Sequence, residues 1–387
     1  MDPMQGSSIK GGSDMNHTSS QQVVVDLFTS AGVEINGSHP WDIQVNKDLF
    51  FKRLMAGGSM ALGESYMDGW WECPRLDQFF DKILRARLDE KAKKSLRALW
   101  CRFKAMVTVS PGKFRAFEIG KRHYDIGNEL FSLMLDKSMN YSCGYWKNAD
   151  TLEAAQEAKM ELICQKLQLA PGMRVLDIGC GWGGLAAYMA RNHQVSVVGI
   201  TVSREQVTLA KERCHGLPVD IRLVDYRDLN EPFDRIVSVG MFEHVGAARY
   251  KTFMGVVNRC LKDRGLFLLH TIAGNRSVRS SDPWISTYIF PNSMIPSGHQ
   301  IAAAAEPFFV LEDWHSFGPD YDPTLMAWYD NFVTHWEKIK HTYDDRFFRM
   351  WTYYLLACAG TFRARSNQLW QIVFSKGGVV PAYDSVR

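Results

Sequence analysis

Two polar side chains, Glu243 and His270, occupy positions where an enzyme could hold an acid and a base. Residues 234–239 and 265–271 contain short apolar runs that predict buried strands. Glu243 follows the first of them, and His270 lies near the end of the second. In an open α/β sheet, ligands bind beyond the carboxyl ends of the strands, so we expect both side chains to face one crevice. A single Glu or His on such a sheet is more often a hydrogen-bonding framework residue. Two that converge at one edge favour catalysis.

A third polar side chain, Asp177, lies near the end of the predicted strand 173–178, and four glycines follow it at 179, 181, 183 and 184. Strand, glycine turn and helix form the first unit of nucleotide-binding α/β folds, where backbone approaches a ligand at the helix N-terminus. Dinucleotide folds carry an acid about 20 residues later, but residues 199–203 are Gly-Ile-Thr-Val-Ser. The segment 175–184 resembles instead the first motif of S-adenosylmethionine-dependent methyltransferases, in which the turn holds the methionine part of the cofactor. The alternative is a tight turn without a ligand.

The elements around these residues alternate between strand and helix after Gly172. Five βα repeats followed by two further strands predict an α/β fold, the Rossmann-like seven-stranded sheet of class I methyltransferases. A helix is expected from about Thr151 to Gln168, with Asp150 as an acceptable N-cap. A longer helical insertion is expected at about 325–360. The predicted strands are 173–178, 195–200, 219–224, 234–239, 265–271, 308–313 and 369–375.

The N-terminal part has shorter, helix-leaning patterns and predicts a smaller, mostly helical domain at residues 21–105. Residues 1–20 are rich in Ser, Gly, Asn and Met, and we expect a disordered tail, native or vector-derived. Apolar spacing predicts helices around 48–54 and 76–84, with a polar-aromatic turn at 63–71 between them. The paired Trp70 and Trp71 in that turn favour core packing; a surface for lipid or a partner subunit is the alternative.

Residues 82–122 carry thirteen Lys or Arg and only three acidic residues, Asp89, Glu90 and Glu118, a net charge of +10. Apolar residues at roughly helical spacing alternate with these charges. Such a segment is typical of a membrane-surface helix or a nucleic-acid face; a solvated helix between domains is equally compatible. Pro111-Gly112 indicates a boundary. We therefore expect a basic linker at 106–122 and a second domain at 123–387.

Composition restricts the remaining function classes. The chain has 387 residues, 46% hydrophobic and 22% charged, with an overall charge of only +3. No apolar run approaches the roughly 20 residues of a membrane span, and no basic region followed by an apolar core begins the chain. The eight cysteines form no C-x-x-C pair, which favours reduced thiols in the cytosol and argues against a zinc site.

Several motifs together resemble those of bacterial cyclopropane-fatty-acyl-phospholipid synthases, over nearly the whole chain from about Leu27 to Phe374. That family transfers a methylene group from S-adenosylmethionine across a cis double bond of a phospholipid acyl chain. The resemblance therefore implies that residues 123–387 are a catalytic domain with an acyl-chain pocket. Related mycolic-acid enzymes share the catalytic half but lack the N-terminal domain, so its presence favours the phospholipid branch. The motifs are G-E-S-Y-M-D-G-W-W (63–71), H-Y-D-I-G-N-E-L-F (123–131), Y-S-C-G-Y-W (141–146), V-L-D-I-G-C-G-W-G-G (175–184), M-F-E-H-V-G (241–246) and F-R-A-R (362–365).

The reaction that this resemblance implies is demanding. An isolated alkene is a poor nucleophile, and its attack on a sulfonium methyl leaves a carbocation that aromatic faces and negative potential can stabilise. A positioned base must then take a proton from the transferred methyl so that the ring can close. In the family that base is bicarbonate, and by resemblance it would be held by Cys143, Glu243, His270, Tyr321 and backbone near Ile272. For Cys143 alone, the alternative to a role in the anion site is that it packs in the core as a small hydrophobic residue.

The resemblance also implies the cofactor site, in which Thr201 and Gln206 take the place of the ribose-binding acid of other methyltransferases. No metal ligand set is expected. The full set of implied cofactor-binding residues is Tyr141, Ser142, Asp177, Gly179, Gly181, Thr201, Gln206, Tyr226 and Arg227.

For partners, the resemblance implies unsaturated phospholipid in an anionic membrane, a homodimer, and a cytoplasmic protein attached peripherally to the inner face of the cytoplasmic membrane. Residues 82–122 with the N-terminal aromatics would dock there, since each cation near anionic headgroups contributes about 1 kcal/mol. Other functions remain open: methylation or methylenation of the alkene without ring closure, N-methylation of a small amine, or an inert lipid- or cofactor-binding module. Nucleic acid is not expected as a partner, because Gly240-Met-Phe-Glu243 is no target-base motif.

Overall fold

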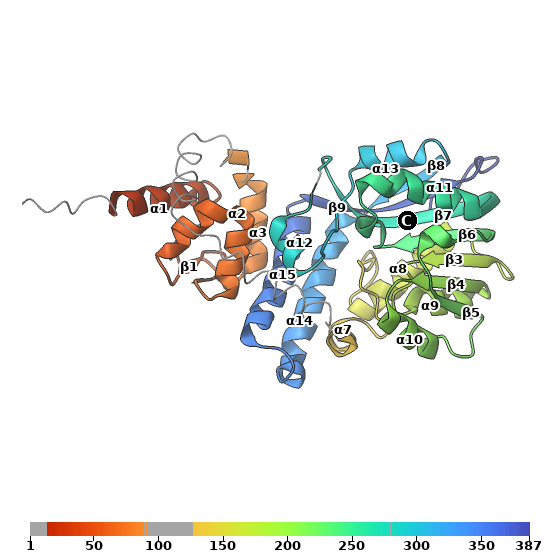
Figure 1. Ribbon diagram of the computed structural model, residues 1–387, viewed down its shortest axis with the longest axis horizontal. Coiled ribbons are helices and arrows are strands. Elements are labelled where there is room, and N and C mark those ends of the chain that lie inside the picture. The colour runs from red at the N-terminus through yellow and green to blue at the C-terminus, as the bar shows by residue number, and fades with distance from the viewer. Residues whose placement is uncertain (1–13, 89, 92–126, 279) are drawn as a thin grey trace, which may run out of the picture. The chain divides into compact units, whose positions relative to one another are not determined.

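The computed structural model describes residues 14–88, 90–91, 127–278 and 280–387. It divides into two compact units (Figure 1). Unit 1 comprises Met1–Arg122, Asp282–Tyr288 and Asp345–Gly360, and unit 2 comprises the rest of the chain. Two segments of the expected catalytic domain, 282–288 and 345–360, therefore group with the N-terminal residues. Residues 123–387 are not one uninterrupted unit, because helices from that range supply part of the unit 1 core.

Unit 2 contains the expected seven-stranded sheet, in the order β5-β4-β3-β6-β7-β9-β8 (Figure 1). The five strands from β5 to β7 are mutually parallel, whereas β9 runs antiparallel to both β7 and β8. The class I methyltransferase fold is thus confirmed, with the predicted strands displaced by a few residues at their ends. Their bounds are β3 (Arg174–Ile178), β4 (Ser196–Thr201), β5 (Val219–Leu223), β6 (Phe233–Val239), β7 (Leu261–Gly274), β8 (Val310–Ser316) and β9 (Asn367–Ser375).

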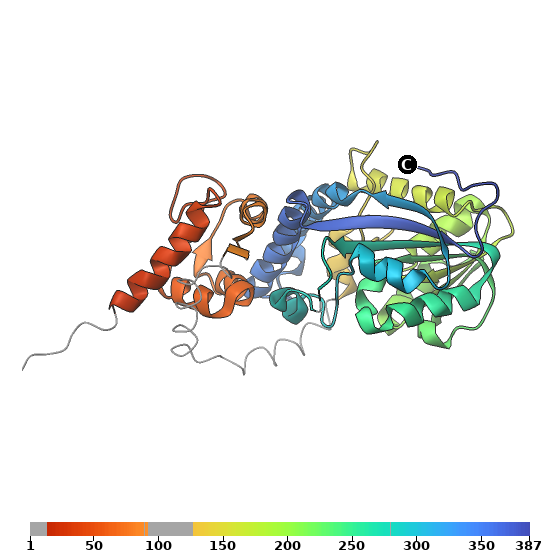
Figure 2. The same cartoon turned by 90° about the horizontal axis from the view of Figure 1, so that it is seen from above.

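Helices cover both faces of this sheet, which is why its central strands bury apolar side chains on both faces. Along β3, Val175 packs into one core and Leu176 into the core of the opposite face. Figure 2 shows α8 in yellow on one side and α11 and α13 in green to cyan on the other. The helices of unit 2 are α7 (Asn128–Met134), α8 (Leu152–Lys166), α9 (Gly184–His193), α10 (Arg204–Arg213), α11 (Tyr250–Cys260), α13 (Gly298–Ala305) and α14 (Tyr321–Ile339).

Helix α8 confirms the helix expected after residue 150, but its N-cap differs from the expected Asp150. The hydroxyl of Thr151 accepts a hydrogen bond from the backbone N–H of Ala154. A threonine oxygen satisfies one of the four unpaired N–H groups of the first turn as well as an aspartate does.

Unit 1 is mostly helical, as expected. Its first helix begins at Asp14, so residues 14–20, expected in a disordered tail, form the opening turns of α1. Further along this helix, Val23 is buried and packs against the partly buried Leu27 and against Met55 of the next helix, α2. Unit 1 contains α1 (Asp14–Thr29), β1 (Gln44–Val45), α2 (Leu49–Met67), β2 (Trp71–Glu72), α3 (Leu76–Arg85), α12 (Pro283–Tyr288) and most of α15 (Asp345–Arg363).

The predicted turn at 63–71 is wrong for its first half, because α2 continues to Met67. Gly63 lies inside this helix, and a Cβ there would come within 2.4 Å of the Trp284 ring of α12. The glycine therefore serves close packing of an aromatic ring, and only residues 68–70 turn the chain. A sequence pattern alone cannot distinguish these two uses of glycine.

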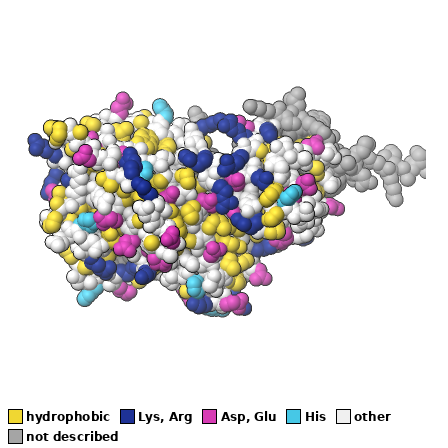
Figure 3. Space-filling view, turned by 180° about the vertical axis from the view of Figure 1, so that it is seen from behind, with side chains coloured by type: hydrophobic (Ala, Val, Ile, Leu, Met, Phe, Trp, Pro, Cys, Tyr) yellow, Lys and Arg dark blue, Asp and Glu magenta, His cyan; other side chains and the backbone are white. Residues whose placement is uncertain are grey.

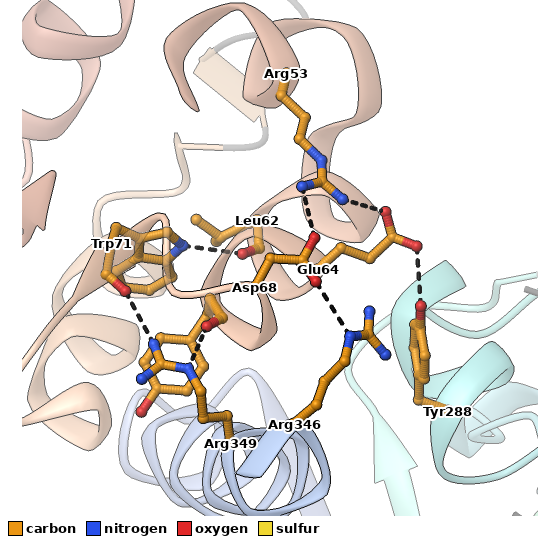
Figure 4. A network of polar contacts seen from close by, with 9 residues as sticks. Arg53, Leu62, Glu64, Asp68, Trp71, Tyr288, Arg346 and Arg349 are labelled. Carbon is orange, nitrogen blue, oxygen red and sulfur yellow. Dashed lines mark hydrogen bonds and ion pairs between the residues drawn. The ribbon is translucent and has the colours of Figure 1, made fainter. Parts of the chain in front are cut away.

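Charged side chains join α2 to α12 and α15 within unit 1 (Figure 4). Arg53 pairs with Glu64 and Asp68, both at 2.9 Å. Glu64 also accepts from the Tyr288 hydroxyl at 2.9 Å, and Asp68 from Arg346 Nε at 3.1 Å. Each of these carboxylates thus has at least two donors.

The two tryptophans after α2 differ in environment. Trp71 is fully buried and its indole N–H donates to the Leu62 carbonyl, so the core interpretation holds for it. Trp70 is partly exposed, with Arg53 at 4.6 Å and Lys47 at 5.4 Å from its ring centroid. Cations stacked on a half-exposed indole place Trp70 at the surface.

Of the basic segment 82–122, only 82–88, 90 and 91 are described; the linker 106–122 and Pro111-Gly112 lie outside the described residues. Arg85 pairs with Asp81, and Lys82 stacks over Trp41 at 4.2 Å. Figure 3 shows Lys and Arg side chains intermingled with acidic and hydrophobic ones on the visible face.

Within the described ranges, no helix combines the length and the apolar character needed to cross a membrane. The seven cysteines in those ranges are free thiols. The same ranges contain no cluster of three or more His, Cys, Asp or Glu side chains arranged to hold a metal ion.

Candidate active site

A cavity of about 430 Å³ opens where β3, β4 and β6 end. The glycine turn after β3 forms its wall: Gly179 and Gly181 have φ of +86° and +53°, which residues with side chains rarely adopt. A Cβ on Gly179 would also meet the Met241 side chain at 2.8 Å. The turn is thus shaped to present bare backbone to the cavity.

All nine residues expected to bind the cofactor line this one cavity. Thr201 and Gln206 are hydrogen-bonded to each other at 2.7 Å, and Arg227 is held by two bonds to Asp225. The Tyr226 hydroxyl is buried without a hydrogen-bond partner. The nine are Tyr141, Ser142, Asp177, Gly179, Gly181, Thr201, Gln206, Tyr226 and Arg227.

Sequence reasoning missed other lining residues, notably Lys159, Trp182 and His244. Trp182 and His244 stand inside the quoted motifs, next to Gly181 and Glu243, and that adjacency could have identified them. Lys159 lies in the middle of α8 and gives no such signal, because a lysine in a helix is usually exposed.

Asp177 and Lys159 place opposite charges beneath this cavity. Asp177 is 2% exposed and its Oδ2 has no hydrogen-bond partner. Burial raises its pKa to about 7, an effect that the positive Lys159 partly opposes. Lys159 is 1% exposed, and burial lowers its pKa to about 8. An unpartnered buried carboxylate at a cavity wall fits the ammonium group of an amino-acid ligand, such as the methionine part of S-adenosylmethionine.

A second polar centre lies at the ends of β6 and β7. The backbone N–H of Ile272 donates to Glu243 Oε1 at 2.7 Å, and the N–H of Gly240 donates to the His270 carbonyl at 2.9 Å. These bonds join the loop after β6 to β7, so Glu243 and His270 come from adjoining backbone. The Ile272 N–H is engaged by Glu243 here, so its part in any anion site is to orient that carboxylate.

Glu243 and His270 are buried, and each leaves one polar atom, Oε2 and Nε2, without a hydrogen-bond partner. Burial raises the pKa of Glu243 to about 7 and lowers that of His270 well below its ordinary value. His270 Nδ1 lies 3.3 Å from the amide nitrogen of Gln371 on β9. With Gln371 donating, the neutral imidazole carries its hydrogen on Nε2, where it can serve an anion.

Cys143 contacts the first turn of α14, the helix that begins with Tyr321. The Cys143 thiol is fully buried, 3.8 Å from the hydroxyl of Thr324, which lies one turn after Tyr321. Burial raises the pKa of this thiol well above its usual range, so it remains an S–H group. Thr324 also accepts from the Gly144 backbone N–H and holds the cysteine loop on α14.

A chain of aromatic contacts runs from the cavity to α14. Tyr141 lies 5.2 Å from Trp328, which lies 6.0 Å from Tyr321, and Tyr321 stacks on Phe362 at 4.4 Å between centroids. Aromatic faces are the surroundings in which a positive charge on an otherwise apolar substrate is stabilised.

Comparison with known proteins identifies the family. The model of the mycolic acid cyclopropane synthetase family matches residues 112–372. The chain belongs to this family. Cyclopropane-fatty-acyl-phospholipid synthase of Escherichia coli (strain K12) is 59% identical over 92% of this chain and 93% of its own. Cyclopropane mycolic acid synthase 2 of Mycobacterium leprae is 34% identical over 67% of this chain and 94% of its own.

Solved structures agree with this assignment. Mycolic acid cyclopropane synthase CmaA1, complexed with SAH and CTAB, matches with a TM-score of 0.62 and 31% identity over 69% of this chain and 99% of that chain. Coclaurine N-methyltransferase matches with a TM-score of 0.66 over 81% and 99%, but at 20% identity it supports the fold alone. Family, fold and cavity together make the chain an S-adenosylmethionine-dependent methyltransferase.

Proposed function

We propose that this protein forms cyclopropane rings in the unsaturated acyl chains of phospholipids. The observation that carries the proposal is the match to the Escherichia coli synthase. It spans 92% of this chain and so extends beyond residues 112–372 into unit 1. The mycolic acid relative covers only 67%. Sharing the N-terminal part favours a phospholipid substrate over a mycolic acid.

S-adenosylmethionine supplies an electrophilic methyl group, to which the alkene's electron pair forms a carbon–carbon bond as the carbon–sulfur bond breaks. The protein would bind the cofactor through the nine lining residues, which include Gly179 and Gly181 of the glycine turn. Tyr141, Trp328 and Tyr321 offer ring faces to the positive charge that develops on the acyl chain. A proton then leaves the transferred carbon, and its bonding pair closes the ring.

The proton acceptor in this proposal is bicarbonate, held by Cys143, Glu243, His270 and Tyr321. In this proposal, His270 Nε2–H, the Tyr321 hydroxyl and the Cys143 thiol would donate to the anion, and Glu243 Oε2 would accept its hydrogen. His270 Nε2 and Glu243 Oε2 are buried without a partner, which supports these two roles. The Cys143 Sγ lies 3.1 Å from the Gly144 carbonyl oxygen, so its S–H would have to turn toward the anion. Ile272 contributes by fixing Glu243 Oε1.

The first test is incubation with S-adenosylmethionine and liposomes containing cis-monounsaturated phospholipid. The expected acyl product is heavier by one CH2 group, has lost its double bond and co-migrates with a cyclopropane standard. A methyl or methylene isomer would assign alkene methylation without ring closure. Bound cofactor with no acyl product would exclude this substrate and direct the search to small amines.

The bicarbonate assignment has its own test. In buffer depleted of carbon dioxide, the wild-type rate should fall and should recover on addition of bicarbonate. A rate that is independent of bicarbonate would remove the anion from the proposal while leaving ring formation in place.

The protein would act as a homodimer at the inner face of the cytoplasmic membrane, attracted by anionic headgroups. Among the described cations, Lys82, Arg87 and Lys91 lie at the start of the basic segment. Replacing these three by Gln should weaken sedimentation with anionic liposomes, at about 1 kcal/mol per charge, and leave cofactor binding intact. Unchanged sedimentation would exclude this segment as the docking surface.

A further inference from the structure

Side chains of helix α8 form hydrogen bonds to the segment 140–144. Gln156 donates from its amide to the Ser142 carbonyl at 2.8 Å. One turn later, Lys159 donates to the Ser142 hydroxyl at 2.9 Å and to Asn140 Oδ1 at 3.3 Å. Ser142 lines the cofactor cavity, and the next residue is Cys143. One face of α8 therefore positions a cofactor-lining hydroxyl through buried polar side chains.

The charge of Lys159 is not neutralised by a carboxylate in direct contact. Among the described residues, no Asp or Glu oxygen forms an ion pair with its ammonium group, although it is 1% exposed. The nearest acids act on it only through space: Asp136 accepts from backbone N–H groups and from Asn140, and Asp177 has an unpartnered Oδ2. A buried cation of this kind is costly unless it meets a negative group of a ligand.

The hydrogen bond between Lys159 and Ser142 has only one possible direction. An ammonium group can only donate, so the Ser142 oxygen accepts and its own hydrogen must point elsewhere. The hydroxyl of Ser142 donates to no group in the described part of the chain, and its residue faces the cavity. The arrangement presents an O–H donor, backed by a positive charge, to whatever occupies that wall.

The same wall carries Asp177. In β3 its side chain leaves on the same face as Val175, the face that α8 covers. The Ser142 hydroxyl, with Lys159 behind it, and the unpartnered Asp177 carboxylate thus both line this cavity. This pair is complementary to a zwitterion that has one carboxylate and one ammonium group.

We propose that Lys159 is a positioning residue for the carboxylate of the cofactor's methionine part. It orients the Ser142 hydroxyl to donate to that carboxylate and supplies the countercharge behind it, while Asp177 receives the ammonium group. The inference depends on S-adenosylmethionine binding in this cavity and is independent of the lipid product.

Two ligands separate this role from a merely structural one. S-adenosylhomocysteine carries the amino-acid end, and 5′-methylthioadenosine lacks its carboxylate and ammonium groups. In calorimetric titrations of the full chain, Lys159→Met should weaken S-adenosylhomocysteine on the order of 10- to 100-fold. The Kd of methylthioadenosine should change less than about threefold, because none of its groups reaches the Lys159 wall.

Two further variants make the result decisive. Ser142→Ala should also weaken S-adenosylhomocysteine selectively. The variant that combines Lys159→Met with Ser142→Ala should bind this ligand little more weakly than either single variant, since the two residues act through one hydrogen bond. Lys166→Met is the matched control: Lys166 is a second buried lysine of α8, paired with Asp313 and away from the cavity, and its loss should leave both Kd values unchanged.

The proposal would be overturned if Lys159→Met weakened the binding of both ligands equally, or if it changed the affinity for neither. If Lys159→Met does not fold, Ser142→Ala is used in its place. An equal change in the Kd of both ligands, or no change in either, would again contradict the proposal. These binding outcomes are independent of the liposome assay, so failure of ring formation and failure of this inference remain distinguishable.

Discussion

The two units differ in whether every buried or half-buried carboxylate and imidazole in the described residues finds a partner within the protein. In unit 1, Glu64 and Asp68 each have two donors, from Arg53 and from a residue of α12 or α15 (Figure 4). In unit 2, Asp177, Glu243 and His270 are buried, and each keeps an atom without a partner. Among the described residues, the unpartnered buried atoms of unit 1 belong only to neutral side chains, Ser65, Trp284 and Thr352.

This contrast separates structural from functional polar groups. A paired carboxylate at a half-exposed position has its desolvation offset within the protein and needs nothing further. A buried carboxylate without a partner destabilises the ligand-free protein, and it persists where a ligand completes it. The following experiments should enlarge or abolish this difference between the units.

The largest effect is expected at the second polar centre. Glu243→Gln keeps an acceptor for the Ile272 N–H but removes the carboxylate that faces the proposed anion. We expect ring formation to slow by roughly 100-fold or more, with the Kd of S-adenosylhomocysteine unchanged. The control Glu337→Gln, on an exposed surface of α14, should retain full turnover. Wild-type turnover in Glu243→Gln would remove this residue from the chemistry.

The Asp177 carboxylate should destabilise the ligand-free protein and strengthen cofactor binding. Its folded-state pKa is raised from 3.8 to about 7, so between these pH values the folded protein retains a proton that the unfolded chain has released. Its contribution to stability is therefore greatest below about pH 4 and is lost as the pH rises to about 7. Asp177→Asn should stabilise the ligand-free protein at pH 8 by on the order of 1–3 kcal/mol and weaken S-adenosylhomocysteine binding.

Urea unfolding of the wild type and Asp177→Asn at pH 4 and pH 8 checks this difference. The two proteins should differ at pH 8 and converge at pH 4. An identical pH dependence in both would mean that the Asp177 carboxylate is not destabilising in the folded state.

In unit 1, packing should matter more than any one ion pair. Gly63→Ala places a Cβ against the Trp284 ring, where 2.4 Å is too close for van der Waals contact. We expect a loss of about 1–3 kcal/mol in unfolding free energy, read from urea melts or from amide exchange in α2. Ser59→Ala, at an exposed position of the same helix, should change stability by less than about 0.5 kcal/mol. Equal melts for both variants would contradict the close packing.

The smallest effect is expected for the ion pairs of Figure 4. Arg346→Met removes one donor from Asp68, but the side chains are 32% and 26% exposed and Arg53 still pairs with Asp68. Solvent screening limits the loss to about 1 kcal/mol or less. A loss that exceeds that of Gly63→Ala would mean that the network, and not the apolar contact, holds α15 in unit 1.

Local chemistry explains what could be predicted from the sequence. Apolar runs gave the seven strands, and the glycines after Asp177 gave the turn, because both signals lie within ten consecutive residues. The nine residues around the cofactor cavity followed from strand ends and from motifs. The resemblance of those motifs carried the family assignment, which the family match confirms.

Tertiary structure alone decided the remainder. Lys159, Thr324 and Gln371 stand in ordinary helix and strand sequence, and each acquires its role only from the side chain that folding brings against it. The sequence pattern around Gly63 suggested a turn. Its true role could not be predicted, because the Trp284 ring that excludes a Cβ there lies more than 200 residues away in the chain. Residues 282–288 and 345–360 join unit 1 for the same reason. The sequence by itself determined which elements form and at which edge of the sheet polar side chains gather. Long-range packing determined which of those polar groups find a partner within the protein and which keep an unpartnered atom.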